Sequence, residues 1–247
     1  MSTETHKISA MRAGGKILQQ VRDQLVQYVK VGCTFAEIEA EAQRLLKKGG
    51  VVPSFSTVPG YHWAPCIMKN DMLCHGIPGK QVVNSGDVIT IDIGCINEGY
   101  HLDTTTSFAV GQVSPVITAF LAAGKQSLQK AIATIGPGTS VYDISFAMEK
   151  VIVRHGYSCV YQLTGHGVGE ELHMEPSIPC IAQKSDKRIL LNPGMTIAVE
   201  IMYAEKNAAV VLADDGWTYV TRDHSLSAMF EETVLVTDAG HEILTNQ

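Results

Sequence analysis

Four acidic residues lie in stretches that otherwise read as buried β-strands: Asp92, Asp103, Glu200 and Glu231. Asp92 is embedded in Val-Ile-Thr-Ile-Asp-Ile-Gly-Cys, and Glu200 in Ile-Ala-Val-Glu-Ile-Met. Burying a carboxylate is costly, so buried acids almost always have a partner. Neither lysine nor arginine occurs within these strands, which leaves histidines or metal ions as the nearby cations. The pattern therefore favours metal ligands over solvated surface acids.

The first two acids flank a β-hairpin signal, in which Asn97-Glu98-Gly99 separates two strand-like runs. With Asn97 and Glu98 as the two-residue loop, Asp92 faces Asp103 directly, with Cβ atoms roughly 5 Å apart. With Glu98 and Gly99 as the loop, the register slips by two residues and both acids stay on one face. Opposed like charges destabilise a sheet unless a cation lies between them, and a divalent metal ion satisfies that need.

A glycine-rich stretch from Thr164 to Pro176 contains two further residues with chemical potential, His166 and His173. Its glycines allow the backbone to approach a ligand closely, and together with Pro176 they argue against a helix. We therefore expect an irregular backbone there. The four acids with one imidazole form an oxygen-rich set. Such a set suits two carboxylate-bridged divalent ions, drawn from Mn, Fe, Co or Zn, better than a single zinc ion.

Three segments recur in the same order at nearly the same spacing, which indicates an internal duplication. In the longest match, residues 84–93 align without gaps on residues 192–201, and Asp92 falls on Glu200. A shared fold in the two halves predicts a pseudo-twofold axis between them. The two acids would then occupy equivalent strand positions and face one common site.

Each half reads as a helix, a short turn, a second helix and then strands. The first helices are expected over 7–30 and 114–135, where apolar residues recur at helical spacing without internal proline. Thr34 and Ser140 each precede an acid by three residues, as in the capping box that starts a helix. The remaining expected boundaries are second-helix ends near Gly50 and Gly156, and strands over 88–96 and 195–203.

The composition excludes several classes of protein. The chain has 247 residues, of which 45% are hydrophobic and 18% charged, so it can bury a large core and is not disordered. Its net charge of −6 and lack of a basic block make nucleic acids and anionic membranes poor partners. Residues 1–7 carry no export signal, and no apolar run is long enough to cross a membrane. Six scattered cysteines without a C-x-x-C pair predict a reducing, cytoplasmic location.

The order and spacing of several motifs resemble those of type I methionine aminopeptidases, over essentially the whole chain. The motifs are Asn70 to Pro78 around His75, Asp92-Ile-Gly with Gly99-Tyr-His-Leu-Asp103, Gly165-His166-Gly-Val-Gly with His173 and Pro176, the strand that contains Glu200, and Phe230-Glu231-x-Thr233-Val.

The resemblance implies an α/β pita-bread fold, an internally duplicated, antiparallel curved sheet covered by helices. It implies one catalytic domain over 1–247, with pseudo-symmetric halves of about 7–110 and 114–240, that is monomeric. The implied activity is removal of an N-terminal methionine that precedes a small residue. The implied partners are peptide and nascent-chain N-termini, with transient ribosome association, and the implied cofactors are two divalent ions (Co, Mn, Fe or Zn).

The resemblance also assigns roles to individual residues. Glu200 would be the general base, and His75 and His173 would be catalytic residues that contact the substrate. The implied metal ligands are Asp92, Asp103, His166, Glu200 and Glu231. The implied lining of the methionine side-chain pocket is Tyr61, Cys66, Leu172 and Trp217.

This chain departs from the family pattern at two places: Ile201 and Glu232 stand where the family commonly has proline and histidine. The segment before Cys66 is also shorter. Three other interpretations compete. An Xaa-Pro peptidase typically has arginine two positions before the last ligand, where this chain has Met229. A non-catalytic relative would have lost ligands, and a redox metal site would have fewer carboxylates and more imidazoles.

Overall fold

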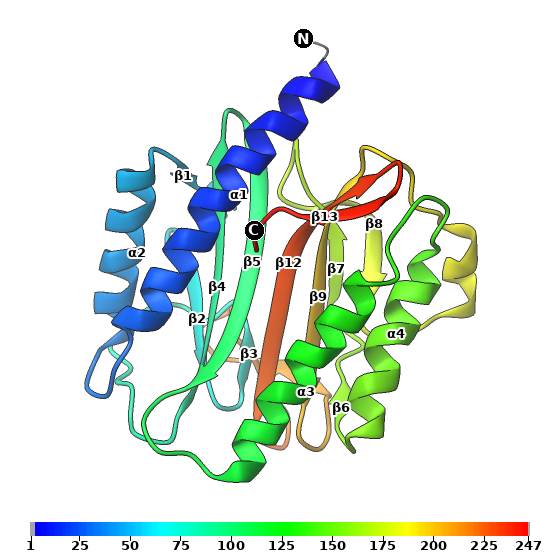
Figure 1. Ribbon diagram of the computed structural model, residues 1–247. Coiled ribbons are helices and arrows are strands. Elements are labelled where there is room, and N and C mark those ends of the chain that lie inside the picture. The colour runs from blue at the N-terminus through cyan, green and yellow to red at the C-terminus, as the bar shows by residue number, and fades with distance from the viewer. Residues whose placement is uncertain (1–2, 247) are drawn as a thin grey trace.

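Four α-helices lie against one side of a large antiparallel sheet in the computed structural model, which describes residues 3–246 (Figure 1). The helices are α1 (Thr3–Tyr28), α2 (Phe35–Gly49), α3 (Pro115–Ile132) and α4 (Val141–Arg154). Two short 3₁₀ helices accompany them, η1 (Phe55–Thr57) and η2 (Lys184–Arg188). None of the described helices has the length and apolar content that a membrane span requires.

The order of strands in the large sheet reflects the duplication. Its path runs β1 (Val52–Pro53), β4 (Val88–Asn97), β5 (Tyr100–Ala109), β12 (Ser227–Thr237), β9 (Thr196–Ala204), β7 (Thr164–Gly167) and β8 (Met174–Pro179). β2 (Pro65–Lys69) pairs with β4, β6 (Ser158–Cys159) with β9, and β13 (Gly240–Ile243) with β12. A smaller sheet contains β10 (Val210–Leu212), β11 (Tyr219–Thr221) and β3 (Met72–Cys74).

The two halves of the chain meet at the centre of the large sheet. β5 and β12 are neighbours there, and β4 and β9 flank them on either side. Helices α1 and α2 pack on the first half, and α3 and α4 on the second (Figure 1). The pseudo-twofold arrangement predicted from the repeat is therefore confirmed, and the buried apolar residues form two clusters, one largely in each half.

Helix boundaries follow the predicted local signals closely. Thr34 accepts a hydrogen bond from the Glu37 backbone N–H at 3.2 Å, and Ser140 caps the equivalent helix in the same way. Both caps are complete capping boxes. Gly50 ends α2 in the left-handed conformation, with φ of 75°. The first helix, however, begins at Thr3 and ends at Tyr28, not over 7–30 as expected.

Of the two registers predicted for the β4–β5 hairpin, the first is wrong and the second is observed. Asn97 pairs with Tyr100, so Glu98 and Gly99 form the loop, with φ of 49° and 88°. A two-residue loop with positive φ at both positions matches the twist of the strands. Glycine at the second position adopts this positive φ without steric cost. Asp92 therefore lies opposite Thr105, and Asp103 lies opposite Gly94. The two acids are offset by one pleat but remain on the same face.

Candidate active site

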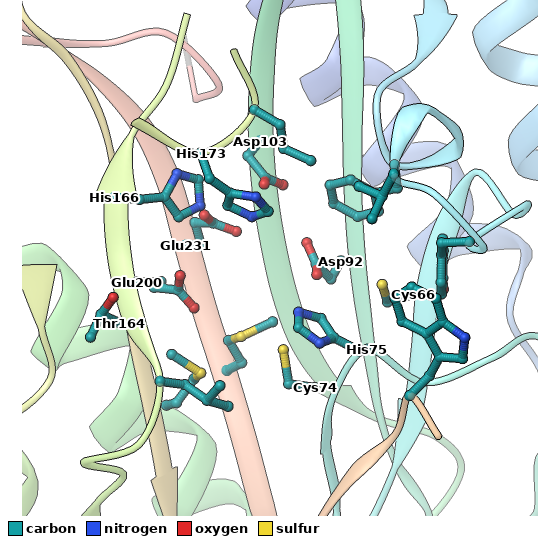
Figure 2. Close-up of a pocket in the computed structure, with 18 of the residues that line it drawn as sticks. Cys66, Cys74, His75, Asp92, Asp103, Thr164, His166, His173, Glu200 and Glu231 are labelled. Carbon is teal, nitrogen blue, oxygen red and sulfur yellow. The ribbon is translucent and has the colours of Figure 1, made fainter. Parts of the chain in front are cut away.

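A cavity of about 300 Å³ lies on the face of the sheet that points away from the helices. Its floor is formed by β4, β5, β12 and β9, and Figure 2 shows acidic side chains from all four strands pointing into it. The residues for which the sequence predicted a role all line this cavity: Tyr61, Cys66, His75, Asp92, Asp103, His166, Leu172, His173, Glu200, Trp217 and Glu231.

The four acids are all buried, as expected from the apolar stretches around them. Asp92 lies on β4, Asp103 on β5, Glu200 on β9 and Glu231 on β12. Ligand atoms of Asp103, His166 and Glu231 all lie within 4.8 Å of one another. In the described part of the chain, no lysine or arginine forms an ion pair with any of the four acids. The cluster is therefore a concentration of negative charge without a protein counter-ion.

Hydrogen bonding within residues 3–246 leaves this cluster incomplete. The Thr105 hydroxyl lies 2.9 Å from Asp92 Oδ1 and 2.8 Å from Glu231 Oε2, yet its one proton can serve only one of them. The buried atoms Asp103 Oδ1 and Glu231 Oε1 have no hydrogen-bond partner among the described residues. Buried polar atoms are normally satisfied. A divalent cation binds several oxygen ligands at close range. These unpartnered carboxylate oxygens therefore fit a metal centre.

Burial raises the pKa of all four carboxyl groups. The pKa of Asp92 rises to about 7, and those of Asp103, Glu200 and Glu231 rise well above their ordinary range because the acids also repel one another. Without a cation the cluster therefore retains protons at neutral pH. A divalent ion would offset the repulsion and restore the ionised carboxylates that act as ligands.

His166 is held in the tautomer that a metal ligand needs. It lies in the short strand β7, so the irregular backbone expected around it begins only after Gly167. His166 Nδ1 lies 2.9 Å from the Gly167 carbonyl oxygen, to which it donates its proton. That leaves the Nε2 lone pair free to bind a cation. Burial, with His173 nearby, lowers the pKa of His166 to about 4 and keeps the ring neutral.

Two more histidines stand at the edge of the acid cluster. The His173 ring lies edge-on to that of His166, with centroids 4.5 Å apart, whereas His75 lies near Asp92 and Cys74 (Figure 2). Burial lowers the pKa of both His75 and His173, so each is a neutral imidazole with one N–H to donate. His75 adopts a left-handed backbone conformation, with φ of 55°.

One wall of the cavity is apolar and aromatic. Cys66 pairs with Asp92 across β2 and β4, and burial raises the pKa of its thiol, which therefore stays neutral. Tyr61 packs edge-on against Trp217 with ring centroids 5.2 Å apart, and its hydroxyl lies within hydrogen-bonding distance of two backbone carbonyls. Leu172 lines the same cavity. This wall can accept an apolar side chain next to the acids.

Sequence reasoning missed several residues of the cavity. Thr105 links two of the acids, and Cys74, Met202 and Met229 contribute to the lining. A period-two signal was available for Thr105, because side chains two apart in a strand share a face and Asp103 was already placed there. Met202 and Met229 carried the same signal, since each lies two residues from an acid on its own strand, whereas Cys74 has only the pattern of an ordinary core residue.

The fold and the carboxylate–histidine site are those of a metallopeptidase, and residues 9–238 match the model of metallopeptidase family M24. The chain is 36% identical to methionine aminopeptidase 1 of Bacillus subtilis (strain 168) over 239 residues, which cover 97% of this chain and 96% of that protein. The crystal structure of methionine aminopeptidase from Thermotoga maritima has a TM-score of 0.95 and 33% identity, with 98% and 97% of the two chains covered. The chain belongs to the methionine aminopeptidases of family M24.

The fold extends to more distant proteins. A prolidase from Pyrococcus furiosus has a TM-score of 0.79 at 21% identity, and the match covers 98% of this chain but 64% of the prolidase. At that identity the likeness shows a shared fold alone.

Proposed function

We propose that this enzyme removes the N-terminal methionine from peptides and nascent proteins when the second residue is small. The observation that carries the proposal is the position of the acid cluster, with its unpartnered carboxylate oxygens, directly beside an apolar wall in one cavity. Membership of the methionine aminopeptidases supports the reaction class and the terminal residue.

Five residues would hold two divalent ions at the floor of the cavity: Asp92, Asp103, His166, Glu200 and Glu231. Their oxygen-rich composition suits Mn, Fe, Co or Zn, and four carboxylates are enough to bridge two ions. When bound, such ions lower the pKa of water toward neutrality and polarise the carbonyl of the bond to be cleaved.

The protein's own groups would bind, orient and move protons. Glu200 would accept the proton of the attacking water, because bound ions would keep its carboxyl group ionised. His173 would donate a hydrogen bond to the oxygen that gains charge. His75 would contact the peptide nitrogen or the departing amine. The neutral state of both imidazoles allows each to donate its N–H without adding a positive charge to the site.

The methionine side chain would occupy the apolar wall formed by Tyr61, Cys66, Leu172 and Trp217. A neutral thiol and edge-on aromatic rings offer dispersion contacts to a thioether without a competing polar group. With the first side chain held there, the peptide bond that follows it would lie beside the acids. This placement would limit cleavage to the first residue of the substrate.

We also propose that residues 1–247 act as a single monomeric catalytic domain in the cytoplasm, in transient association with the ribosome. The free cysteines in the structure fit a reducing compartment.

A groove between α3 and α4 is lined by Lys130, Lys150 and Arg154, and none of the described residues that line it is acidic. Such a groove could contact ribosomal phosphates even though the chain as a whole is acidic. Cosedimentation with ribosomes at low salt should weaken in a Lys130→Glu/Lys150→Glu variant.

One experiment tests the reaction. Metal-stripped protein is supplied separately with Mn, Co, Fe and Zn and assayed on Met-Gly-Met-Met and on Gly-Pro peptides. We expect metal-dependent release of methionine and little cleavage before proline. Preference for the Xaa-Pro peptides would replace the proposal with a prolidase activity, and full activity of the stripped protein in chelator would refute a metal mechanism.

A further inference from the structure

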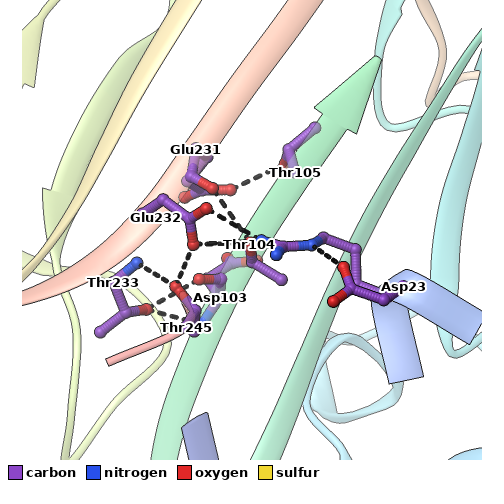
Figure 3. Close-up of polar contacts among 9 residues, drawn as sticks. Asp23, Asp103, Thr104, Thr105, Glu231, Glu232, Thr233 and Thr245 are labelled. Atoms are coloured by element: carbon purple, nitrogen blue, oxygen red, sulfur yellow. Dashed lines mark hydrogen bonds and ion pairs between the residues drawn. The ribbon is translucent and has the colours of Figure 1, made fainter. Parts of the chain in front are cut away.

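A buried ion pair joins the two halves of the molecule on the helix side of the sheet, directly behind the acid cluster. Arg22 of α1 donates from Nη1 to Glu232 Oε1 of β12 at 2.9 Å, and the two side chains are only 8% and 9% exposed. Figure 3 shows Glu232 among threonines from β5, β12 and the C-terminal segment.

The alternation of side chains along strands places this pair behind the active site. Glu231 points into the cavity, so Glu232 points to the helix side, and the same relation holds for Asp103 and Thr104. β5 and β12 pair at only two positions, Glu231 with Thr105 and Glu232 with Thr104. The strands that carry Asp103 and Glu231 are therefore joined by a short ladder at the junction of the two halves.

Threonine side chains extend this short ladder and connect it to the ion pair. Thr104 Oγ1 accepts from Arg22 Nη1 at 2.8 Å and donates to the Glu231 backbone carbonyl at 3.0 Å. Thr233 Oγ1 donates to the Asp103 carbonyl at 2.7 Å and accepts from the Asp103 N–H at 3.0 Å. These side-chain bonds add to the strand pairing that already holds the backbone of both acids.

Thr245 closes the network. The Thr233 backbone N–H donates to Thr245 Oγ1 at 2.9 Å, and the Thr245 hydroxyl in turn donates to Glu232. One path therefore runs from Arg22 through Thr104 to the Glu231 backbone. A second path runs from Arg22 through Glu232, Thr245 and Thr233 to the Asp103 backbone. All side chains of the network are buried, and Arg22 and Glu232 also line a cavity beside α1 and α3.

We propose that Arg22 and Glu232, acting through Thr104, Thr233 and Thr245, are positioning residues that set the separation of Asp103 and Glu231 and thereby the affinity for metal. This inference rests on the proposed metal site. Stability alone explains the network poorly, because a buried ion pair can often be replaced by apolar residues without loss of stability. Partners that orient metal ligands, in contrast, typically change metal affinity by 10–100-fold when removed.

The test separates positioning from stability by using two kinds of variant. Glu232→Gln removes the buried charge partner of Arg22 and leaves it the exposed Asp23, so both stability and metal affinity should fall. The double variant Arg22→Met/Glu232→Leu removes both charges and fills the space, so it should regain stability. A matched control is Arg12→Gln, which breaks an ion pair to Glu242 that also ties α1 to the second half, at a site away from the β5–β12 junction.

Affinity for Mn and Co is measured by calorimetry on metal-stripped protein, alongside urea unfolding. We expect the double variant to bind metal about 10–100-fold more weakly than the wild type at near-native stability, and Arg12→Gln to bind normally. Native metal affinity in the double variant would overturn the positioning role. So would a loss of affinity that simply follows stability across all variants, the control included. Failure of the wild-type protein to bind either metal would instead refute the proposed function.

Discussion

Asp103 and Glu231 stand on adjacent central strands, one from each half of the chain, and each retains a buried carboxylate oxygen that has no hydrogen-bond partner among the described residues. Together with His166 they place ligand atoms within 4.8 Å of one another. The site therefore exists only where the duplicated halves meet. Its chemistry depends on how the β5–β12 junction holds two acids that would otherwise repel each other.

Removal of metal should abolish activity reversibly. Chelated and dialysed protein is expected to lose methionine release, because none of the described residues that line the cavity is a lysine or arginine able to offset the acid cluster. Activity should return on addition of about two equivalents of divalent metal per chain, as a dinuclear site requires. The measurement is a titration of activity against added metal, with bound metal determined by elemental analysis. Saturation at one equivalent would contradict the dinuclear centre.

The metal-free protein should lose stability as the pH rises through neutrality. Asp92 has a pKa of about 7 in the folded protein against an ordinary 3.8, so its contribution is full at low pH and is lost as pH rises through 7. The raised pKa values of Asp103, Glu200 and Glu231 also make the stability fall as the pH rises. His166, with its lowered pKa, acts in the opposite direction but only below about pH 6.5.

Urea unfolding with chelator between about pH 6.5 and 8 isolates the effect of the acids. The free energy of unfolding should fall across this range, and saturating Mn should remove the fall because bound metal favours the ionised carboxylates. A free energy that rises with pH in chelator would show that the acids are not protonated in the metal-free protein.

Asp103→Asn should separate metal binding from stability. The substitution removes one of four mutually repelling acids, so the metal-free variant should be at least as stable as the wild type at about pH 8. The wild type should gain about 2.7 kcal/mol at a metal concentration 100 times its Kd, and the variant should gain far less at that concentration.

Asp87→Asn is the matched control for Asp103→Asn, because Asp87 is a buried aspartate that accepts hydrogen bonds from Asn70 and Asn84 outside the cavity. It should lose stability and keep the full metal-dependent gain. An equal metal-dependent gain in the two variants would remove Asp103 from the ligand set.

His75→Asn should reduce turnover without loss of metal. Asparagine tolerates the left-handed conformation of His75 better than alanine does, so the fold should be preserved. We expect about a 10²–10⁴-fold loss in kcat, the range for one positioned hydrogen-bonding or proton-transfer group. Metal content is measured on the same samples, with His62→Asn at an exposed position as the control. Loss of metal in His75→Asn would make this histidine a ligand.

The sequence by itself determined the features that depend on neighbouring residues. Capping boxes at Thr34 and Ser140 start the second helices because the bonds involved span only three residues. Acids within apolar strands were recognisable as buried, and the repeat placed Asp92 and Glu200 on flanking strands of one sheet. These predictions were correct because strand periodicity, helix capping and the cost of burying a charged group all depend on residues that are close in the sequence.

The tertiary structure decided what depends on pairing between distant segments. The Glu98–Gly99 loop selected the hairpin register, since backbone twist and not charge set the pairing. Thr105 became a bridge between two acids only when β12 came to lie beside β5. Arg22 and Glu232 are 210 residues apart and met only because α1 packs over that junction. Such contacts depend on how the whole sheet packs. The residue pattern along a single strand does not predict that packing.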